Sequence, residues 1–340
     1  MLQLIGPLLL VGATLLALSS RRPKVNPIFQ ELFEVFHAKI KLDEHDERRN
    51  LRVKRETLLN VLRGKLSHAD LPFEWFHQGS YAMRTGVVPK DGNYDIDVGL
   101  IFECGVERFP DPVALKCIVR DALNGYNRTV VIRRPCVTVT YQRNGLPEFH
   151  VDLAVYMRQP NGSLVIAMGR EFSKPEQREW VPAAPGELTQ FVISSFSGGE
   201  QAQLRRCIRY LKRWRDENFI DGAPLSIALT LAAARWFEPR TLEDGTFVDL
   251  EALHCLVKTM QGKFELGLFS NKLVVSLPGS VKGDLMARLS APQMSAFSEQ
   301  LNILASVIEK CFGDGPRGDA ARVLASTFGS DFPIPVEGSC

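Results

Sequence analysis

The chain has 340 residues and a net charge of +2 at pH 7, with 45% hydrophobic and 24% charged residues. This length suffices for one large or two medium domains, each with its own core. The near-neutral charge excludes a surface built throughout to bind nucleic acid, so any basic function must be local. The seven cysteines are scattered, and neither a C-x-x-C pair nor a Cys/His cluster has the spacing of a zinc site. Scattered thiols favour a reducing cytoplasm.

The N-terminus carries an apolar segment at residues 2–18, which is followed by Arg21, Arg22 and Lys24. Its length is about the lower limit for crossing a bilayer. No cation precedes it, which disfavours a secretory signal peptide, and the cations after it would keep the rest of the chain in the cytoplasm. We interpret residues 1–22 as a membrane anchor that tethers a cytoplasmic protein to the inner membrane, or as an upstream extension from a misassigned start codon.

The next segment, residues 26–66, has apolar side chains at helical spacing among charged ones, which predicts helices. The basic run at residues 48–55 is interpreted as a solvated helix face. From about residue 73 the pattern becomes that of strands. Three segments carry it: 94–102, 128–142 and 148–157.

A helix fits between the first two strand segments, around residues 111–126. Asn144-Gly145 predicts a hairpin turn between the last two. Strands and helices interleaved in this way predict a mixed sheet with helices packed on it.

The domain organisation follows from these patterns. We expect an α+β domain with the mixed sheet at residues 25–170 and a helical second domain at residues 171–330. Residues 331–340 contain two prolines and no periodicity, which predicts an extended, flexible tail.

Two aspartates, Asp95 and Asp97, stand inside an otherwise apolar strand segment. Alternation along a strand places both on one face, with their Cα atoms roughly 6 to 7 Å apart. Like charges this close repel each other unless a cation lies between them, and oxygen ligands of this kind suit Mg²⁺. Asp152 alternates with apolar residues in a later strand. If the two strands are neighbours, three carboxylates can hold two divalent ions, Mg²⁺ or Mn²⁺, about 4 Å apart for phosphoryl transfer. Solvated carboxylates at a strand end are the structural alternative.

Gly79 and Ser80 precede this strand. Glycine lets backbone amides approach a phosphate closely, and a serine hydroxyl donates to one of its oxygens, particularly where a short helix begins. We therefore predict that this pair binds phosphate. His77, just before it, is interpreted as a packed histidine.

Taken together, the segment HQGSYAMRTGVVPKDGNYDIDVGLIF resembles the signature of the polymerase-β-like nucleotidyltransferases, in which Gly-Ser and three acidic residues bind a metal-bound nucleoside triphosphate. It is more similar still to the bacterial CD-NTases, relatives of cyclic GMP-AMP synthase. The resemblance covers roughly residues 60–235. It implies a polymerase-β-like fold with its active site between the two domains. It also implies synthesis of a cyclic di- or trinucleotide messenger for anti-phage defence, from ATP and from GTP or pyrimidine triphosphates.

The resemblance assigns two further residues. The basic helix at residues 199–218 is similar to the family's helix after the catalytic sheet, so Lys212 is implied to meet the triphosphate. Most of the other cations of this helix are interpreted as a solvated face. Ser226 is implied to approach the phosphates, although a first-turn or N-cap residue is the simpler reading. No insertion resembles the zinc element of the animal sensors, and no DNA template is expected.

Two other functions remain open from the sequence. One is a related nucleotidyltransferase, such as an RNA-tailing enzyme or a nucleotide-adding toxin. The other is a non-catalytic, membrane-tethered nucleotide-binding module, which three carboxylates disfavour. The resemblance further implies a ubiquitin-transfer-like partner enzyme that would join the C-terminal carboxylate to a target amine. Residues 338–340 would then form the attachment point.

Overall fold

The computed structural model of the protein describes residues 27–42, 47–92, 94–125, 128–143, 146–265, 267, 271–312 and 317–335. Within these ranges the strands form one mixed sheet of order β1-β2-β5-β4-β3, extended by β6 beside β5 and by β7 beside β6. Strands β2 and β5 are parallel, and the other neighbours are antiparallel. The strands are β1 (Phe73–His77), β2 (Tyr94–Phe102), β3 (Arg128–Ile132), β4 (Val137–Arg143), β5 (Leu146–Arg158), β6 (Leu164–Met168) and β7 (Glu179–Ala183).

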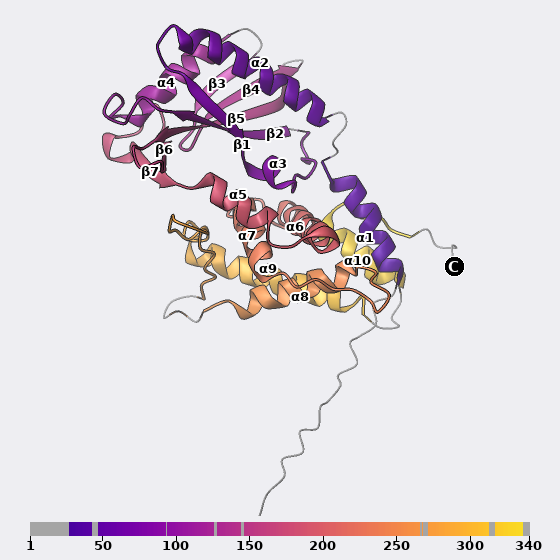
Figure 1. Cartoon of the computed structure of the whole chain (residues 1–340). Helices are drawn as coiled ribbons and strands as arrows, with labels where there is room; N and C mark the ends of the chain where they lie inside the picture. Colours follow the sequence, from indigo (N-terminus) through magenta and orange to yellow (C-terminus); the bar gives the residue numbers. More distant parts are fainter. Residues whose placement is uncertain are drawn as a thin grey trace, which may run out of the picture.

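One face of this sheet is apolar and is covered by α2 (Glu47–Ser67) and α4 (Pro112–Leu123), as Figure 1 shows. Every second residue of β2 and β5 points into this core, including Ile96, Val98 and Leu153, which are at most 1% exposed. The alternation of a strand therefore sends their sequence neighbours to the opposite face. That opposite face turns toward the helical half of the molecule.

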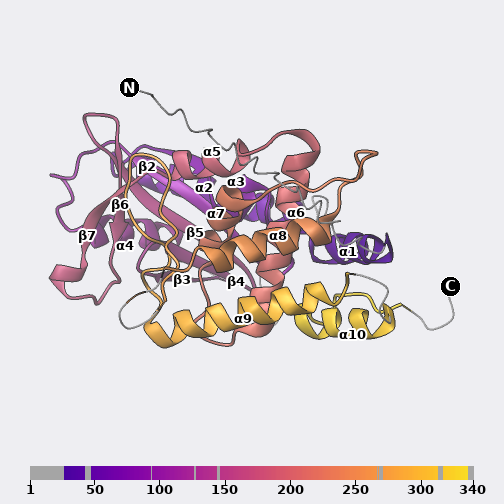
Figure 2. The same cartoon turned by 90° about the horizontal axis from the view of Figure 1, so that it is seen from below.

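The helical half packs around α6 (Gly198–Asn218), the long helix nearest the sheet half in Figure 1. In the view of Figure 2, α8 (Asp249–Gly262) and α9 (Ala291–Glu309) lie in front of the sheet half. A second core fills the space between these helices. The remaining helices are α1 (Pro27–Ile40), α3 (Gly79–Met83), α5 (Pro185–Ile193), α7 (Ser226–Trp236), α8 (Asp249–Gly262), α9 (Ala291–Glu309) and α10 (Arg317–Phe328).

The fold class and most predicted elements are confirmed. Residues 26–66 form α1 and α2, and the helix expected around 111–126 is α4. The expected strand at 128–142 is two strands, β3 and β4, because a turn that contains Pro135 interrupts it. β4 and β5 pair antiparallel as the predicted hairpin requires.

The halves of the molecule divide differently from the predicted boundaries. The sheet continues through β7 to Ala183, beyond the boundary predicted at residue 170. α1 packs into the helical core, because Phe33 and Phe36 contact Tyr210 of α6 and Phe328 of α10. The N-terminal helix therefore belongs by packing to the second half.

Two expectations about exposed segments are wrong. The basic residues of α6 do not form a solvated face: Arg209 and Lys212 are each 4% exposed and Arg213 is 1% exposed. The helix lies between the sheet half and the other helices, so its cations find carbonyl partners instead of water. In the basic run of α2, Arg49 and Arg52 are exposed as expected, and among the described side chains of this run only Arg55 is buried, against the ring of Trp75.

The beginning of the C-terminal tail is likewise packed. Phe332 is 2% exposed, and its ring lies 5.3 Å from that of Phe33 and 5.1 Å from that of Phe36. Burial of an aromatic ring outweighs the lack of regular structure here. The expectation of a free tail therefore fails at Phe332, whereas Ile334 is exposed.

Several predictions lie outside the described residues. These are the anchor at residues 2–18 within 1–22, the turn residues Asn144 and Gly145, and the attachment point at residues 338–340. Every helix within the described ranges is too short or too polar to cross a membrane.

Candidate active site

The predicted carboxylates of β2 lie on the sheet face that turns toward the helical half. Ile96 and Val98 point into the apolar core, so Asp95 and Asp97 point the other way. Asp95 is exposed to the cavity between the halves, and Asp97 is half-buried. The β2 pattern thus fixes both side chains on one surface.

The third carboxylate joins them through the sheet register. β2 and β5 run parallel, and Asp97 lies directly opposite Asp152. One ligand oxygen from each of Asp95, Asp97 and Asp152 lies within 4.8 Å of the others. The sequence alone did not establish that these two strands are neighbours, and the structure places them side by side.

The charges of the three carboxylates are poorly compensated. Among the described residues, no ion pair involves any of them. The pKa of Asp95 is raised, first because the cavity walls limit its hydration and then by the charges of Asp97 and Asp152. Loss of hydration and the charge of Asp152 also raise the pKa of Asp97. Repulsion of this kind is relieved by a bound cation.

The donor set fits a hard divalent cation. Three carboxylates supply oxygen ligands only, which suits Mg²⁺ or Mn²⁺ and does not suit a metal that prefers thiolates. No other cluster of three His, Cys, Asp or Glu side chains in the described part of the chain could hold an ion. The triad therefore indicates that the protein uses a divalent metal.

Position 79 lies so close to the carboxylate triad that only glycine fits there. Gly79 begins the short helix α3 and has a φ of +65°, in the region that favours glycine. A Cβ atom at this position would lie 1.7 Å from Oδ2 of Asp97. The close approach of the backbone to the carboxylate is thus possible only without a side chain. Ser80 follows in the same turn and lines the cavity.

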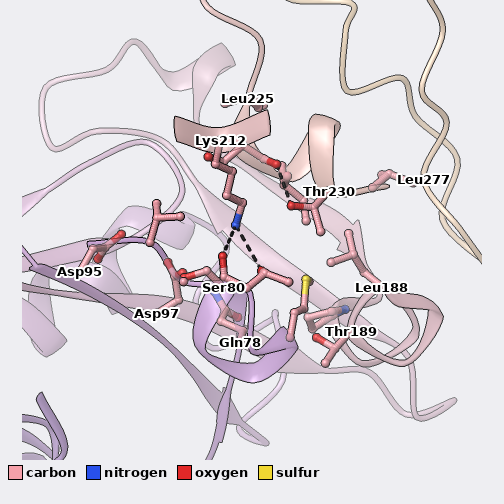
Figure 3. A pocket seen from close by; sticks show the side chains of 18 of the residues that line it. Gln78, Ser80, Asp95, Asp97, Leu188, Thr189, Lys212, Leu225, Thr230 and Leu277 are labelled. Atoms are coloured by element: carbon pink, nitrogen blue, oxygen red, sulfur yellow. Dashed lines mark hydrogen bonds between the residues drawn. The ribbon is translucent and has the colours of Figure 1, made fainter. Parts of the chain in front are cut away.

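The cavity between the halves has a volume of about 580 Å³ and gathers most of the predicted site residues. Gly79, Ser80, Asp95 and Asp97 line it from the sheet half, and Lys212 reaches toward them from α6 (Figure 3). Asp152 completes the triad from the neighbouring strand. Apolar side chains line another part of the same cavity: Leu188, Leu225, Ile227 and Leu277.

Lys212 is hydrogen-bonded to the segment that follows α3. Its Nζ atom donates to the carbonyl oxygen of Thr85 at 3.0 Å and to Oγ1 of Thr85 at 3.2 Å. Burial and the neighbouring Arg209 and Arg215 lower the pKa of Lys212 to about 7. An anionic ligand in the cavity would favour its protonated form.

Lys212 is one of three α6 cations that hold the same segment. Arg209 donates to the carbonyls of Arg84 and Gly86, and Arg213 donates to the carbonyl of Val88 at 2.8 Å. These contacts join the helical half to the loop beside Gly79. The sequence did not predict this role. A basic stripe on an amphipathic helix has the same residue pattern whether its hydrogen bonds go to water or to carbonyl groups.

Ser226 is the first residue of α7, as the simpler sequence interpretation expected. Its Oγ accepts a hydrogen bond of 2.6 Å from Nη1 of Arg215, and both residues line the cavity. Arg215 was not singled out from the sequence, although it lies one helical turn beyond Lys212. His77 is packed between the rings of Trp75 and Tyr81 and beside Arg55, as expected.

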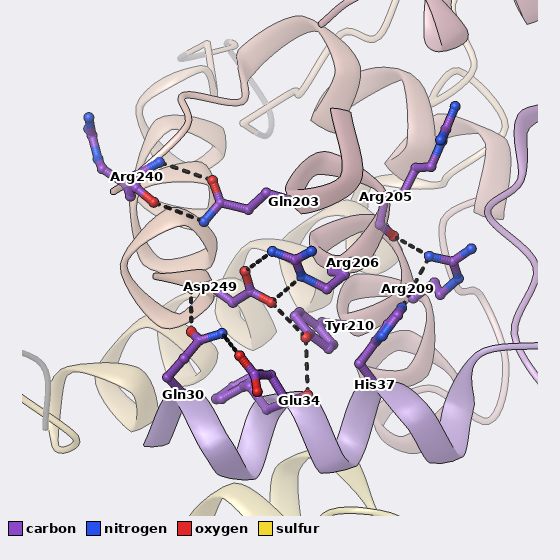
Figure 4. Close-up of polar contacts among 11 residues, drawn as sticks. Gln30, Glu34, His37, Gln203, Arg205, Arg206, Arg209, Tyr210, Arg240 and Asp249 are labelled. Atoms are coloured by element: carbon purple, nitrogen blue, oxygen red, sulfur yellow. Dashed lines mark hydrogen bonds and ion pairs between the residues drawn. The ribbon is translucent and has the colours of Figure 1, made fainter. Parts of the chain in front are cut away.

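A second polar cluster lies within the helical half and has a different character (Figure 4). Asp249, at the start of α8, is fully buried and receives two hydrogen bonds from Arg206, at 2.6 and 2.8 Å. The hydroxyl of Tyr210 donates to it at 2.9 Å. The backbone N–H of Asp249 donates to Oε1 of Gln30 at 2.8 Å. The carboxylate is fully compensated and joins α8 to α6, and the backbone N–H joins α8 to α1.

Comparisons with known proteins agree with this geometry. Residues 73–156 match the family described as "Cyclic GMP-AMP synthase DncV-like, nucleotidyltransferase domain". The matched segment runs from β1 through β5 and contains Gly79, Ser80 and the three aspartates.

Solved structures match most of the chain. The CD-NTase CdnG of Bradyrhizobium diazoefficiens in complex with GTP has a TM-score of 0.70 at 17% identity, over 89% of this chain and 95% of that chain. The DncV cyclic AMP-GMP synthase of Vibrio cholerae, with a linear intermediate, has a TM-score of 0.61 at 16% identity, over 89% and 86% of the two chains. Its apo form gives 0.59 at 17% identity, over 88% and 81%.

The chain has the fold of the CD-NTases CdnG and DncV, and the segment that matches the DncV-like nucleotidyltransferase domain carries the carboxylate triad. These matches confirm the resemblance to the bacterial CD-NTases that the sequence shows.

Proposed function

We propose that the protein is a template-independent nucleotidyltransferase that makes a cyclic di- or trinucleotide from nucleoside triphosphates. The observation that carries this proposal is the meeting of three carboxylates, the Gly79-Ser80 turn and Lys212 at one cavity. The relatives described as CdnG with GTP and as the cyclic AMP-GMP synthase DncV support it.

The proposed reaction joins a ribose hydroxyl to the α-phosphorus of a triphosphate. The hydroxyl oxygen forms the new P–O bond, the bond to the β-phosphate breaks, and pyrophosphate leaves. Two divalent ions, when bound, would neutralise the phosphate charge and lower the pKa of the attacking hydroxyl. Asp95 and Asp97 would hold both ions, and Asp152 would complete the site and receive the proton of the hydroxyl.

Other residues would position the substrate. Gly79 allows the backbone to approach the phosphates, and Ser80 offers a hydroxyl donor. Lys212 supplies a compact positive charge that suits a flexible polyphosphate. Ser226 is held by Arg215 at the same cavity and would contact the phosphate tail. The apolar lining around Leu188 and Leu225 offers a surface for a nucleobase.

Product analysis tests this function. The full chain is incubated with the four ribonucleoside triphosphates and Mg²⁺ or Mn²⁺, and the products are treated with phosphatase and identified by mass spectrometry. We expect small cyclic products that resist phosphatase. Their synthesis should release pyrophosphate. Linear tails on RNA or nucleotides added to another molecule would instead favour the related tailing enzyme or toxin. Nucleotide binding without any turnover would favour a binding module.

The role in anti-phage defence is a separate part of the proposal. It predicts that cells carrying the gene with its native neighbours resist phage infection, and that variants lacking the β2 carboxylates do not. Equal phage titres on both strains would refute the defence role without affecting the proposed chemistry.

A further inference from the structure

The sheet register aligns a threonine with the third carboxylate of the triad. Thr138 of β4 lies directly opposite Asp152 of β5, which in turn lies opposite Asp97 of β2. The three side chains therefore form one row across three neighbouring strands. Thr138 is 3% exposed, so its side chain is shielded from water.

The hydroxyl of Thr138 makes a directed contact with Asp152. Its Oγ1 donates to Oδ1 of the carboxylate. The Sγ atom of Cys136 lies 3.6 Å from the same hydroxyl oxygen. Because a hydroxyl has a single proton and Asp152 receives it, the thiol of Cys136 is the donor to Thr138.

We propose that Thr138 is the positioning residue of Asp152. It fixes the rotamer of Asp152 and thereby determines which carboxylate oxygen is free to bind the metal and to receive the proton of the attacking hydroxyl. This inference rests on the proposed function for its kinetic part. The threonine engages Oδ1, so Oδ2 is the carboxylate oxygen free of this contact. A ligand held in this way loses less conformational freedom when an ion binds.

The neighbouring row of the sheet supplies a matched control. Thr140 lies one step along β4 on the same face, opposite His150 of β5. Its Oγ1 is 2.9 Å from Nδ1 of that histidine. Thr140→Val therefore removes an equivalent hydroxyl from the same strand without touching Asp152.

The experiment compares Thr138→Val, Thr138→Ser and Thr140→Val in the full chain. Metal affinity is measured by calorimetric titration of the apo protein with Mn²⁺, and kcat and KM are measured with nucleoside triphosphate. We expect Thr138→Val to lower Mn²⁺ affinity and kcat by about 10- to 100-fold each. KM for the nucleotide should change little. Thr138→Ser should recover most of the loss, and Thr140→Val should stay within about threefold of wild type.

The two readouts separate this inference from the proposed function. Mn²⁺ affinity is read without turnover, so a protein that makes no nucleotide product would refute the function while still reporting on Thr138. Wild-type affinity in a folded Thr138→Val protein would overturn the inference. An equal loss in Thr140→Val would also overturn it, because the effect would then belong to the strand and not to the contact with Asp152.

A second pair of variants covers a failure of Thr138→Val to fold. Thr138→Ser and Thr138→Ala both lose the γ-methyl group and differ only in the hydroxyl. We expect the serine protein to bind Mn²⁺ at least about tenfold more tightly than the alanine protein. Equal affinities would refute the positioning role.

Discussion

The buried Asp249 of the helical half and the carboxylate triad at the cavity differ in how their charge is compensated. Asp249 is fully buried, yet Arg206 and Tyr210 donate three hydrogen bonds to it from within the protein. Asp95, Asp97 and Asp152 lie together with no ion pair among the described residues. The first cluster is complete and can only stabilise the fold, whereas the second needs a cation from outside. Compensation, more than burial, therefore distinguishes the candidate catalytic carboxylates from the structural one.

The largest expected effect comes from neutralising the triad. Asp95→Asn combined with Asp97→Asn should reduce product formation by at least about 1,000-fold, because the variant lacks the charges that hold the metal ions. The melting temperature of the metal-free protein should stay equal or rise, since mutually repelling charges are removed. Product is measured by mass spectrometry and stability by thermal unfolding. Turnover near the wild-type rate would refute the nucleotidyltransferase mechanism.

The same Asp-to-Asn substitution at Asp249 should have the opposite effect on stability, because it should lower the free energy of unfolding. Asp249→Asn leaves the guanidinium of Arg206 without its partner, and such a loss typically costs about 3 to 5 kcal/mol of unfolding free energy. Arg206 is partly exposed, so we expect the lower end of this range. Urea titration measures the change. An Asp249→Asn protein as stable as wild type would mean that the Arg206–Asp249 ion pair contributes no net stability.

Gly79 tests how closely the backbone must approach the triad. Gly79→Ala places a methyl group against Asp97 and puts alanine at a φ of +65°, which costs about 1 to 2 kcal/mol. We expect a loss of activity of at least about tenfold, measured as kcat/KM. Gly162→Ala is the matched control, because Gly162 also has a positive φ but has open space around its Cβ position. Similar activity losses in both variants would show that strain, and not the contact with Asp97, is responsible.

The smallest expected effect is the pH dependence of stability. The folded-state pKa values of Asp95 and Asp97 are raised above the ordinary value near 4. Protonation of these groups therefore stabilises the metal-free protein at low pH, and this contribution is lost as pH rises through the raised pKa values. Mg²⁺ should accordingly raise the melting temperature by more at pH 8 than at pH 5.5. The Asp95→Asn, Asp97→Asn protein should lack this difference, and an equal Mg²⁺ effect at both pH values in wild type would contradict it.

The sequence by itself determined the local elements and the candidate chemistry. Alternation in β2 and β5 placed Asp95, Asp97 and Asp152 opposite apolar residues, because a strand has a period of two and its other face had to be buried. The Gly-Ser pair predicted a close approach of the backbone to a phosphate, whereas the close approach that the structure shows is to Asp97. These are short-range consequences of side-chain type and spacing, which a single chain segment contains.

The tertiary structure decided which segments meet. The parallel pairing that sets Asp152 opposite Asp97 joins residues far apart in the chain, and no local pattern specifies it. The packing of α6 between the two halves turned its expected solvated cations into donors to the loop after Gly79. The burial of Phe332 likewise depends on α1 and α10. The type and spacing of side chains determine which groups they can hydrogen-bond. Packing determines which of those groups lies within reach.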